Sequence, residues 1–121
     1  MEHRFVHVGF HFAKTVKMTE LEPVFTAIGS DWLRLSSLSW ILWTNKPTPH
    51  IFTLLAPHLD TQGGDQVIIA PLDMSQGFGF LSPWIWNWFE NKTPGSAFSR
   101  GPDALALMRL PESAFKQLTN K

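Results

Sequence analysis

The sequence has no cysteine, no net charge and no long apolar run. Without cysteine the chain can form neither a disulfide nor a metal site built on thiolates. No segment reaches the roughly 18 consecutive apolar residues that a membrane-spanning helix needs, and the first residues lack the apolar region of a signal peptide. We therefore expect a cytoplasmic protein with no membrane partner.

The absence of net charge also bears on nucleic acid as a partner. Ten basic and ten acidic residues cancel. Proteins that bind nucleic acid through charge are usually basic, because the release of counterions from phosphates drives much of the affinity. Charge therefore gives no support to such a partner. Arg34 and Lys46 are candidate phosphate contacts, although exposure of both cations to solvent is the favoured interpretation.

Aromatic residues are the main excess, with ten Phe and six Trp in 121 residues. Such an excess can mark a stacking surface or a dimer interface, but a small core filled with large side chains is the favoured interpretation. A chain of this length can bury one core. We therefore predict a single domain over residues 1–121, with its core at 4–90 and an extension at 91–121.

The hydrophobic periodicity predicts the order of the secondary structure. The predicted elements are a strand at 4–12, a helix at 19–28, a hairpin at 31–45 that turns at Ser36 and Ser37, a helix from Thr48, a strand at 66–72 and a helix from Ser82. Residues 74–81, which contain G-F-G-F, fit either a fifth strand or a loop, and 112–118 fit a short helix. Pro71 predicts that the strand at 66–72 ends at a sheet edge or beyond the ladder.

Local signals support the helices. Thr19 and Glu22 form a capping box, and Thr48 followed by Pro49 is a typical helix start. The predicted buried residues of the helix from Thr48 are Ile51, Leu54, Leu55 and Leu59, and those of the helix from Ser82 are Trp84, Ile85, Trp88 and Phe89. Trp86 points away from that last set and is a candidate to pack on a partner, on the tail or on a nucleobase.

The order strand, helix, strand, strand, helix, strand is typical of a ferredoxin-like α+β fold, here followed by an aromatic third helix and the C-terminal extension. Both main helices then cover one face of an antiparallel sheet. The other face is left open by these helices and is either solvated, covered by the C-terminal segment or covered by a second subunit. We expect a dimer because that face is too apolar for full exposure. The candidate residues for an interface or a ligand surface are Phe5, Trp43, Phe78, Phe80 and Trp86.

Three histidines fall on the open face of the first predicted strand, because alternation places residues 3, 7 and 11 on one side. His7 and His11, with Lys14 nearby, are candidate catalytic residues for metal-free RNA cleavage, in which a dimer axis brings His11 close to its copy. Residues four apart on a strand lie roughly 13 Å apart, too far to share one metal ion. The favoured alternative is that the imidazoles are hydrogen-bonded and inert.

The remaining polar candidates have simpler interpretations. Asp60, Asp65 and Asp73 bracket the strand at 66–72, and we favour bonds to local backbone in turns over metal binding or acid–base work. His58 falls at the end of a predicted helix, where an imidazole interacts favourably with the helix dipole.

Taken together, these features resemble the small SinR-like proteins, distant relatives of the CRISPR-associated adaptation nucleases and of VapD-type toxins. The resemblance covers residues 4–90 and rests on the order of elements, the hairpin D-W-L-R-L-S-S-L-S-W-I-L-W-T-N, the helix ending L-A-P-H-L-D, the strand Q-V-I-I-A-P-L and the aromatic W-I-W-N-W-F. It implies a homodimer associated through sheet edges, in a mobile-element, toxin–antitoxin or phage-defence setting.

The resemblance also bears on metal binding. In the nuclease relatives, an aspartate near the end of the first strand helps to hold a divalent metal. The corresponding tract here is V-G-F-H-F, which places His11 at that position, and no Asp precedes Asp31. Because Mg²⁺ prefers oxygen ligands, we expect no metal and no other cofactor.

Three hypotheses for function follow. The first is a non-catalytic, homodimeric binding or assembly module that has a protein partner. The second is an endoribonuclease or endonuclease of the same fold that uses His11. The third is a small-molecule sensor that uses the aromatic open face. An open cleft at His11 favours the nuclease, an apolar dimer surface favours the module, and a closed aromatic pocket favours the sensor.

Overall fold

A computed structural model describes residues 2–14, 20–28, 31–75, 77 and 79–94. The chain divides into two compact units, residues 1–72 and residues 73–121. The first unit contains four strands and two α-helices, and the second contains a third α-helix.

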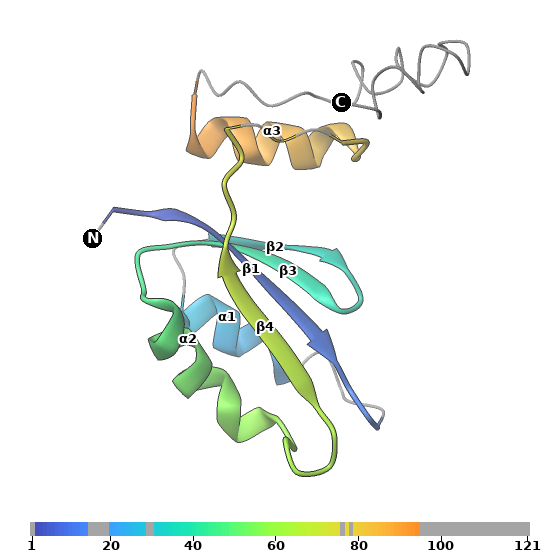
Figure 1. Cartoon of the computed structure of the whole chain (residues 1–121). Helices are drawn as coiled ribbons and strands as arrows, with labels where there is room; N and C mark the ends of the chain where they lie inside the picture. The colour runs from blue at the N-terminus through green and yellow to red at the C-terminus, as the bar shows by residue number, and fades with distance from the viewer. Residues whose placement is uncertain (1, 15–19, 29–30, 76, 78, 95–121) are drawn as a thin grey trace, which may run out of the picture. The chain divides into compact units, whose positions relative to one another are not determined.

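The first unit is built on one antiparallel sheet with the strand order β2-β3-β1-β4 (Figure 1). Its strands are β1 at Arg4–His11, β2 at Asp31–Ser36, β3 at Ser39–Thr44 and β4 at Gln66–Pro71. Helix α1 at Glu22–Ile28 precedes β2, and helix α2 at Thr48–Leu55 continues into a short 3-10 helix, η2, at Ala56–His58 before β4. The element order and the sheet order together confirm the predicted ferredoxin-like α+β fold.

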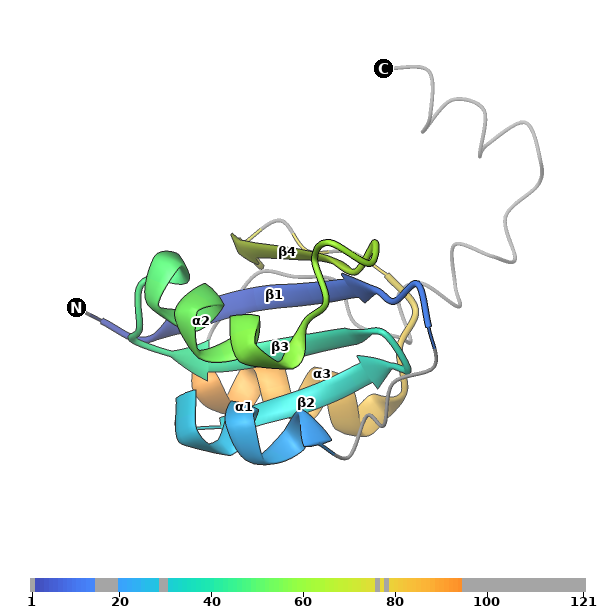
Figure 2. The ribbon, with the colours of Figure 1, turned by 90° about the horizontal axis from the view of Figure 1, so that it is seen from below.

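Both helices of this unit lie on the same face of the sheet (Figure 2). The alternation of β1 explains why, since Val6, Val8 and Phe10 are apolar and point to that face. The register places Val6 opposite Leu42 and Val8 opposite Trp40. The buried residues of the resulting core are Val6, Val8, Phe10, Leu21, Phe25, Ile28, Trp40, Leu42, Ile51 and Leu55.

Aromatic rings fill the centre of this core. The ring of Trp40 lies 5.1 Å from that of Phe25 and 5.5 Å, edge-on, from that of Phe10. Such tilted arrangements are the favourable geometry for aromatic pairs. Phe10, Phe25 and Trp40 therefore serve to fill the core, which is the interpretation of the aromatic excess that the composition favoured.

Several local predictions need correction. The hairpin turns at Ser37 and Leu38, with Ser36 paired to Ser39, because the pairing between β2 and β3 shifts between Arg34 and Ser36. Thr48 is the first residue of α2 rather than its cap, and Pro47 occupies the cap position. The proposed capping residue Thr19 and the stop at Gly29 lie outside the described residues.

The buried face of α2 is also narrower than predicted. Ile51 and Leu55 are buried and Leu59 packs against the core, but Leu54 is exposed. The three residues between Ile51 and Leu55 are all exposed, so the helix buries only one residue per turn against the sheet. Phe52 lies on the exposed side of the helix.

In the second unit, α3 spans Pro83–Lys92. Its buried residues are Ile85, Trp86 and Phe89, whereas Trp84 is 56% exposed. The prediction that Trp84 is buried is therefore wrong, and the exposed tryptophan of this helix is Trp84 rather than Trp86. None of the described helices combines the length and the apolar character that crossing a membrane requires.

Residues 74–81 fit the loop prediction where they are described, since no strand is assigned at residues 74, 75, 77 and 79–81. Phe80 is exposed. Phe78 lies outside the described residues, as do the predicted apolar run and helix of the C-terminal extension.

Candidate functional site

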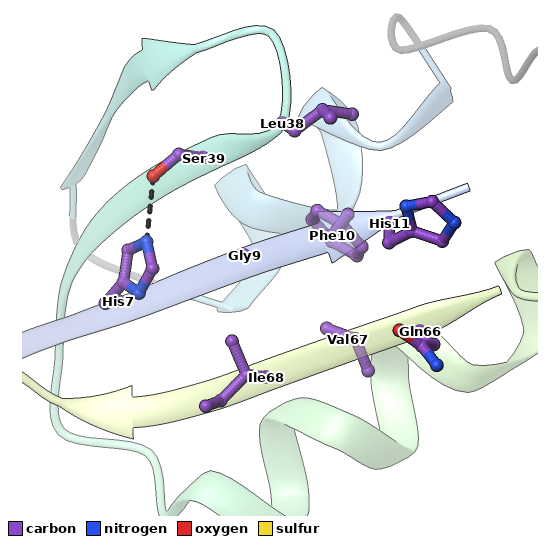
Figure 3. Close-up of a pocket in the computed structure, with 9 residues that line it drawn as sticks. All are labelled: His7, Gly9, Phe10, His11, Leu38, Ser39, Gln66, Val67 and Ile68. Atoms are coloured by element: carbon purple, nitrogen blue, oxygen red, sulfur yellow. Dashed lines mark hydrogen bonds between the residues drawn. The ribbon is translucent and has the colours of Figure 1, made fainter.

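The open face of the sheet carries a hollow of about 570 Å³ in the first unit (Figure 3). It spans the three strands β3, β1 and β4 at the end of the sheet where β1 finishes. The residues that line it are His7, Gly9, Phe10, His11, Leu38, Ser39, Gln66, Val67 and Ile68. Two predicted catalytic residues, His7 and His11, thus belong to the same hollow.

Gly9 lies between the two histidines on β1. Because it has no side chain, it leaves space in the middle of the hollow. A Cβ atom built on Gly9 would lie 3.1 Å from Cε1 of His7 and 3.4 Å from Cγ2 of Ile68. A real side chain at this position would therefore press against the His7 ring. The missing side chain of Gly9 gives the imidazole room to lie over the strand.

His7 is held at one end of the hollow by Ser39 on the neighbouring strand. Nε2 of His7 and Oγ of Ser39 share a hydrogen bond of 2.8 Å, in which the tautomer of the ring sets the donor (Figure 3). Ser39 stands opposite Gly9 in the register, and His7 stands opposite Ile41. The bond is therefore diagonal across two strands, and it supports the prediction that His7 is hydrogen-bonded.

His11 lies at the other end of the hollow, beside Gln66, and is exposed (Figure 3). Asp65 is nearby, and its carboxylate accepts backbone hydrogen bonds from Asp60 (2.9 Å) and from Ala13 (3.0 Å). These two bonds lower the pKa of Asp65 below its ordinary value of 3.8, and the positive charges of His11 and Lys14 lower it further. Asp65 thus joins the end of β1 to the turn before β4.

The turn aspartates behave as predicted. Asp60 accepts a hydrogen bond from the backbone of Gly63, and Asp73 accepts one from that of Ser75. No group of three or more His, Asp or Glu residues in the described part of the chain is arranged to hold a metal ion.

The aromatic candidates on the first unit lie at the opposite end of β1. The ring of Trp43 packs 4.8 Å from that of Phe5 and 5.7 Å from that of His3. Phe5 is buried and Trp43 is half-buried. His3 therefore shares the face of His7 and His11, as predicted, but it does not line their hollow.

Of the two candidate phosphate contacts, the Arg34 side chain has partners within the chain, whereas the bond of Lys46 is made by its backbone. The Arg34 guanidinium donates to the carbonyl groups of Ser36 and Ser37, and it lies 5.1 Å from the centre of the Trp40 ring. The Lys46 backbone N–H donates to Oγ1 of Thr44. Their contact with nucleic acid stays a prediction.

A second feature of the first unit is the free edge of β4. Leu72 donates a backbone hydrogen bond to Phe5, and bonding positions alternate along an antiparallel ladder. By the register of β1 and β4, Gln66, Ile68 and Ala70 also direct their backbone toward β1. The backbone groups of Val67, Ile69 and Pro71 therefore point away from the sheet, where no described segment pairs with them.

Apolar side chains flank this edge on both faces of the sheet. Ile68, on the open face, is 61% exposed. On the helix face, a groove of about 300 Å³ is lined by Thr48, Pro49, Phe52, Val67 and Ile69, and Phe52 is 44% exposed. The strand order confirms the sheet edge predicted from Pro71, whose nitrogen, which carries no hydrogen, faces away from the ladder.

Sequence reasoning missed Ser39, Gln66 and Ile68. The signal for Gln66 and Ile68 was present, since alternation from the core residues Val67 and Ile69 places them on the open face. Their closeness to His7 and His11 depends on the register between strands, which no residue pattern in the sequence specifies.

Comparison with known proteins adds no relative, as no family model, no curated protein and no solved structure matches this chain. In the described part of the chain, the fold defines a class of protein: a small ferredoxin-like α+β protein with a hollow on the face of the sheet opposite its two helices and an uncharged strand edge at β4.

Proposed function

We propose that the protein is a homodimeric binding and assembly module that does no chemistry of its own, and that two copies associate through β4. The resemblance to SinR-like proteins supports this proposal, and it is the sole basis for a setting in mobile elements, toxin–antitoxin systems or phage defence. The observation that carries the dimer is the contrast between the two edges of the sheet.

The edge at β2 is protected against pairing. The outward N–H of Trp32 is taken by the carboxylate of Asp31 at 2.8 Å. Arg34 occupies the carbonyl groups of Ser36 and Ser37, and a register shift interrupts the strand. Charged side chains and bulges are the usual means by which proteins prevent edge-to-edge association.

The edge at β4 has neither a charged side chain nor a register shift, and its one proline, Pro71, is the last residue of the strand. The strand Q-V-I-I-A-P carries no charge, and the outward N–H groups of Val67 and Ile69 face away from the sheet. Two copies of this strand, antiparallel about a two-fold axis, place these donors opposite carbonyl groups of the second copy. The exposed side chains of Ile68 and Phe52 then lose contact with water on the two faces of the joined sheet.

Two features of the hollow support a role without catalysis. An imidazole that acts as a general base is usually oriented by a third group, such as a carboxylate. The carboxylate of Asp65, whose pKa the charge of His11 helps to lower, already accepts two backbone hydrogen bonds. His7 bonds to Ser39, which carries no charge.

The dimer is tested by size-exclusion chromatography with light scattering over a range of concentrations. We expect the wild type to be dimeric, and Ile68→Glu and Phe52→Glu to weaken self-association by about tenfold or more, because like charges then meet across the axis. The matched control is Leu35→Glu, which places the same charge on the exposed edge strand β2 and is expected to leave the dimer intact. A monomeric wild type, or a dimer lost only in the control, contradicts the proposal.

The nuclease remains a second candidate, because His11 is exposed and shares an open hollow with His7. Pure protein is incubated with labelled single-stranded RNA and duplex DNA, with Mg²⁺ and with EDTA. Cleavage that survives EDTA, disappears in His11→Ala and persists in the control His58→Ala, a histidine exposed on η2, would establish a histidine nuclease and remove the non-catalytic proposal. Absence of cleavage by a dimeric wild type supports the module.

A further inference from the structure

We infer that the hollow binds a nucleobase, a flat and uncharged nitrogen heterocycle that lies over Gly9. In this arrangement His7 and Ser39 bond to one side of the ring, and Gln66 and His11 bond to the other. All the lining residues belong to one chain, so this inference does not depend on the proposed dimer.

Gly9 is the first observation that carries the inference. Glycine in the interior of a strand weakens it and often marks a place where a ligand or another backbone approaches closely. The backbone does not require glycine here, because Gly64 is the only glycine with a positive φ in the described part of the chain. What Gly9 provides is therefore space above the central strand, between the His7 ring and Ile68.

The second observation is the chemistry of the lining. None of its side chains is Lys, Arg, Asp or Glu, whereas phosphate groups are usually bound by Arg and Lys. Imidazole, carboxamide and hydroxyl groups can each donate and accept hydrogen bonds, which matches the mixed donors and acceptors along the edge of a base. Glutamine reads adenine in this manner, and imidazole rings stack on unpaired bases.

The third observation is the volume of the hollow and the apolar side chains at its sides. A hollow of about 570 Å³ falls within the range of small-molecule sites, roughly 300–1,000 Å³. Ile68 and Leu38 are 61% and 41% exposed on its sides, and contact with a flat ring would remove their apolar surface from water.

The base could come from a free nucleoside or from a single strand, and one experiment separates these sources. The full chain, labelled with ¹⁵N, is titrated with adenosine, guanosine, cytidine and uridine, with single-stranded oligonucleotides of the same bases, and with ribose 5-phosphate. We expect saturable shifts of the amide signals of Gly9, Ser39 and Ile68 with at least one nucleoside, and none with ribose 5-phosphate. Tenfold tighter binding of an oligonucleotide would assign the source to a strand, and similar affinity would assign it to the free nucleoside.

Variants of two lining residues, each with a matched control, test whether the base binds in the hollow. Gly9→Ala raises the floor and displaces His7, so we expect about tenfold weaker binding, with Gly79→Ala as control because no atom lies near a Cβ at that position. Gln66→Leu removes the carboxamide and should weaken binding about three- to tenfold, the effect of one hydrogen bond. Gln62→Leu, in the exposed turn before β4, is its control.

Three results would overturn the inference. They are the absence of shifts with every nucleoside and oligonucleotide, equal shifts with ribose 5-phosphate, and wild-type affinity in both folded Gly9→Ala and Gln66→Leu. Phe52→Glu, which lies outside the hollow, should bind the base normally even as a monomer, so failure of the dimer and failure of the base site can be told apart.

Discussion

Asp65, a half-buried residue, helps to fix the geometry of the hollow. Its two carboxylate oxygens accept from Ala13, just beyond β1, and from Asp60, before β4. The ends of these two strands carry His11 and Gln66, which form one side of the hollow. Asp65 does not line the hollow itself, but by joining these two segments it helps to position both side chains.

Asp65→Asn is expected to lower the free energy of unfolding at pH 7, because an amide has one oxygen in place of two and carries no charge. The folded-state pKa of Asp65 lies below 3.8, owing first to the bond from Asp60. The stabilisation is therefore complete above the unfolded pKa and is lost as the pH falls through the folded pKa. Urea unfolding followed by tryptophan fluorescence at pH 7, 5 and 3 should show the variant and the wild type converging at low pH.

The control for this prediction is Asp73→Asn. The pKa of Asp73 is also lowered, by hydrogen bonds from Ser75, but this contact is local and joins no two strands. We expect a smaller effect on unfolding at pH 7. A difference between Asp65→Asn and wild type that stays constant from pH 7 to pH 3 would contradict the role assigned to the carboxylate.

The three histidines show how much of the hollow could be predicted from the sequence. Alternation along the first strand was enough to place His3, His7 and His11 on one face, because a strand has a period of two. It could not select which two share a hollow. That selection depends on Ser39 and Gln66, which are brought beside the histidines by pairings 32 and 55 residues away in the sequence.

At the scale of elements, Thr44 joins the end of β3 to two other segments. It is the only buried polar residue among those described, at 1% exposure. Its hydroxyl donates to the carbonyl of Ile28, at the end of α1 (3.2 Å), and accepts from the backbone of Lys46 (3.1 Å). One hydroxyl group thus satisfies a helix end and the start of the loop that leads to α2.

Thr44→Val is expected to lower the free energy of unfolding by about 1–3 kcal/mol, because valine fills the same volume but leaves both backbone groups without a partner. Chemical denaturation of the purified variants measures this value. Thr53→Val is the matched control, since the Thr53 hydroxyl bonds only to the carbonyl of Pro49 on an exposed helix surface. We expect a change within about 0.5 kcal/mol there, and equal effects at the two positions would refute the role of Thr44.

Element order and type were predictable, whereas faces and ends were less so. The capping and proline signals located α2 to within one residue, because such signals act through the local backbone. The face of α3 was predicted only in part. Ile85 and Phe89 are buried as expected, but the tryptophans were misplaced because all three are large and periodicity alone does not rank them. Pro71 indicated a sheet edge at the end of β4, but the contrast between the β2 and β4 edges depends on strand order and register, which the sequence does not specify.

At the scale of the whole molecule, the two units differ in what they contain. Residues 1–72 hold the complete sheet, both covering helices and every member of the ten-residue core. They also hold all residues of the hollow and of the β4 edge. The features on which both proposals rest are therefore confined to one unit of the chain.

We expect a chain that ends at Leu72 to fold by itself. All ten residues of its core belong to residues 1–72, and domains of about this length can fold alone. Its ¹H–¹⁵N spectrum should keep the dispersed signals of the full chain for Val8, Phe25 and Leu42, and its urea transition should be cooperative. Trp32, Trp40 and Trp43 report on this unit alone in the shortened chain, since the other three tryptophans lie in the second unit. An unfolded fragment would mean that residues 73–121 supply part of the stability of the sheet, and the dimer and base-binding experiments would then have to be interpreted for the chain as a whole.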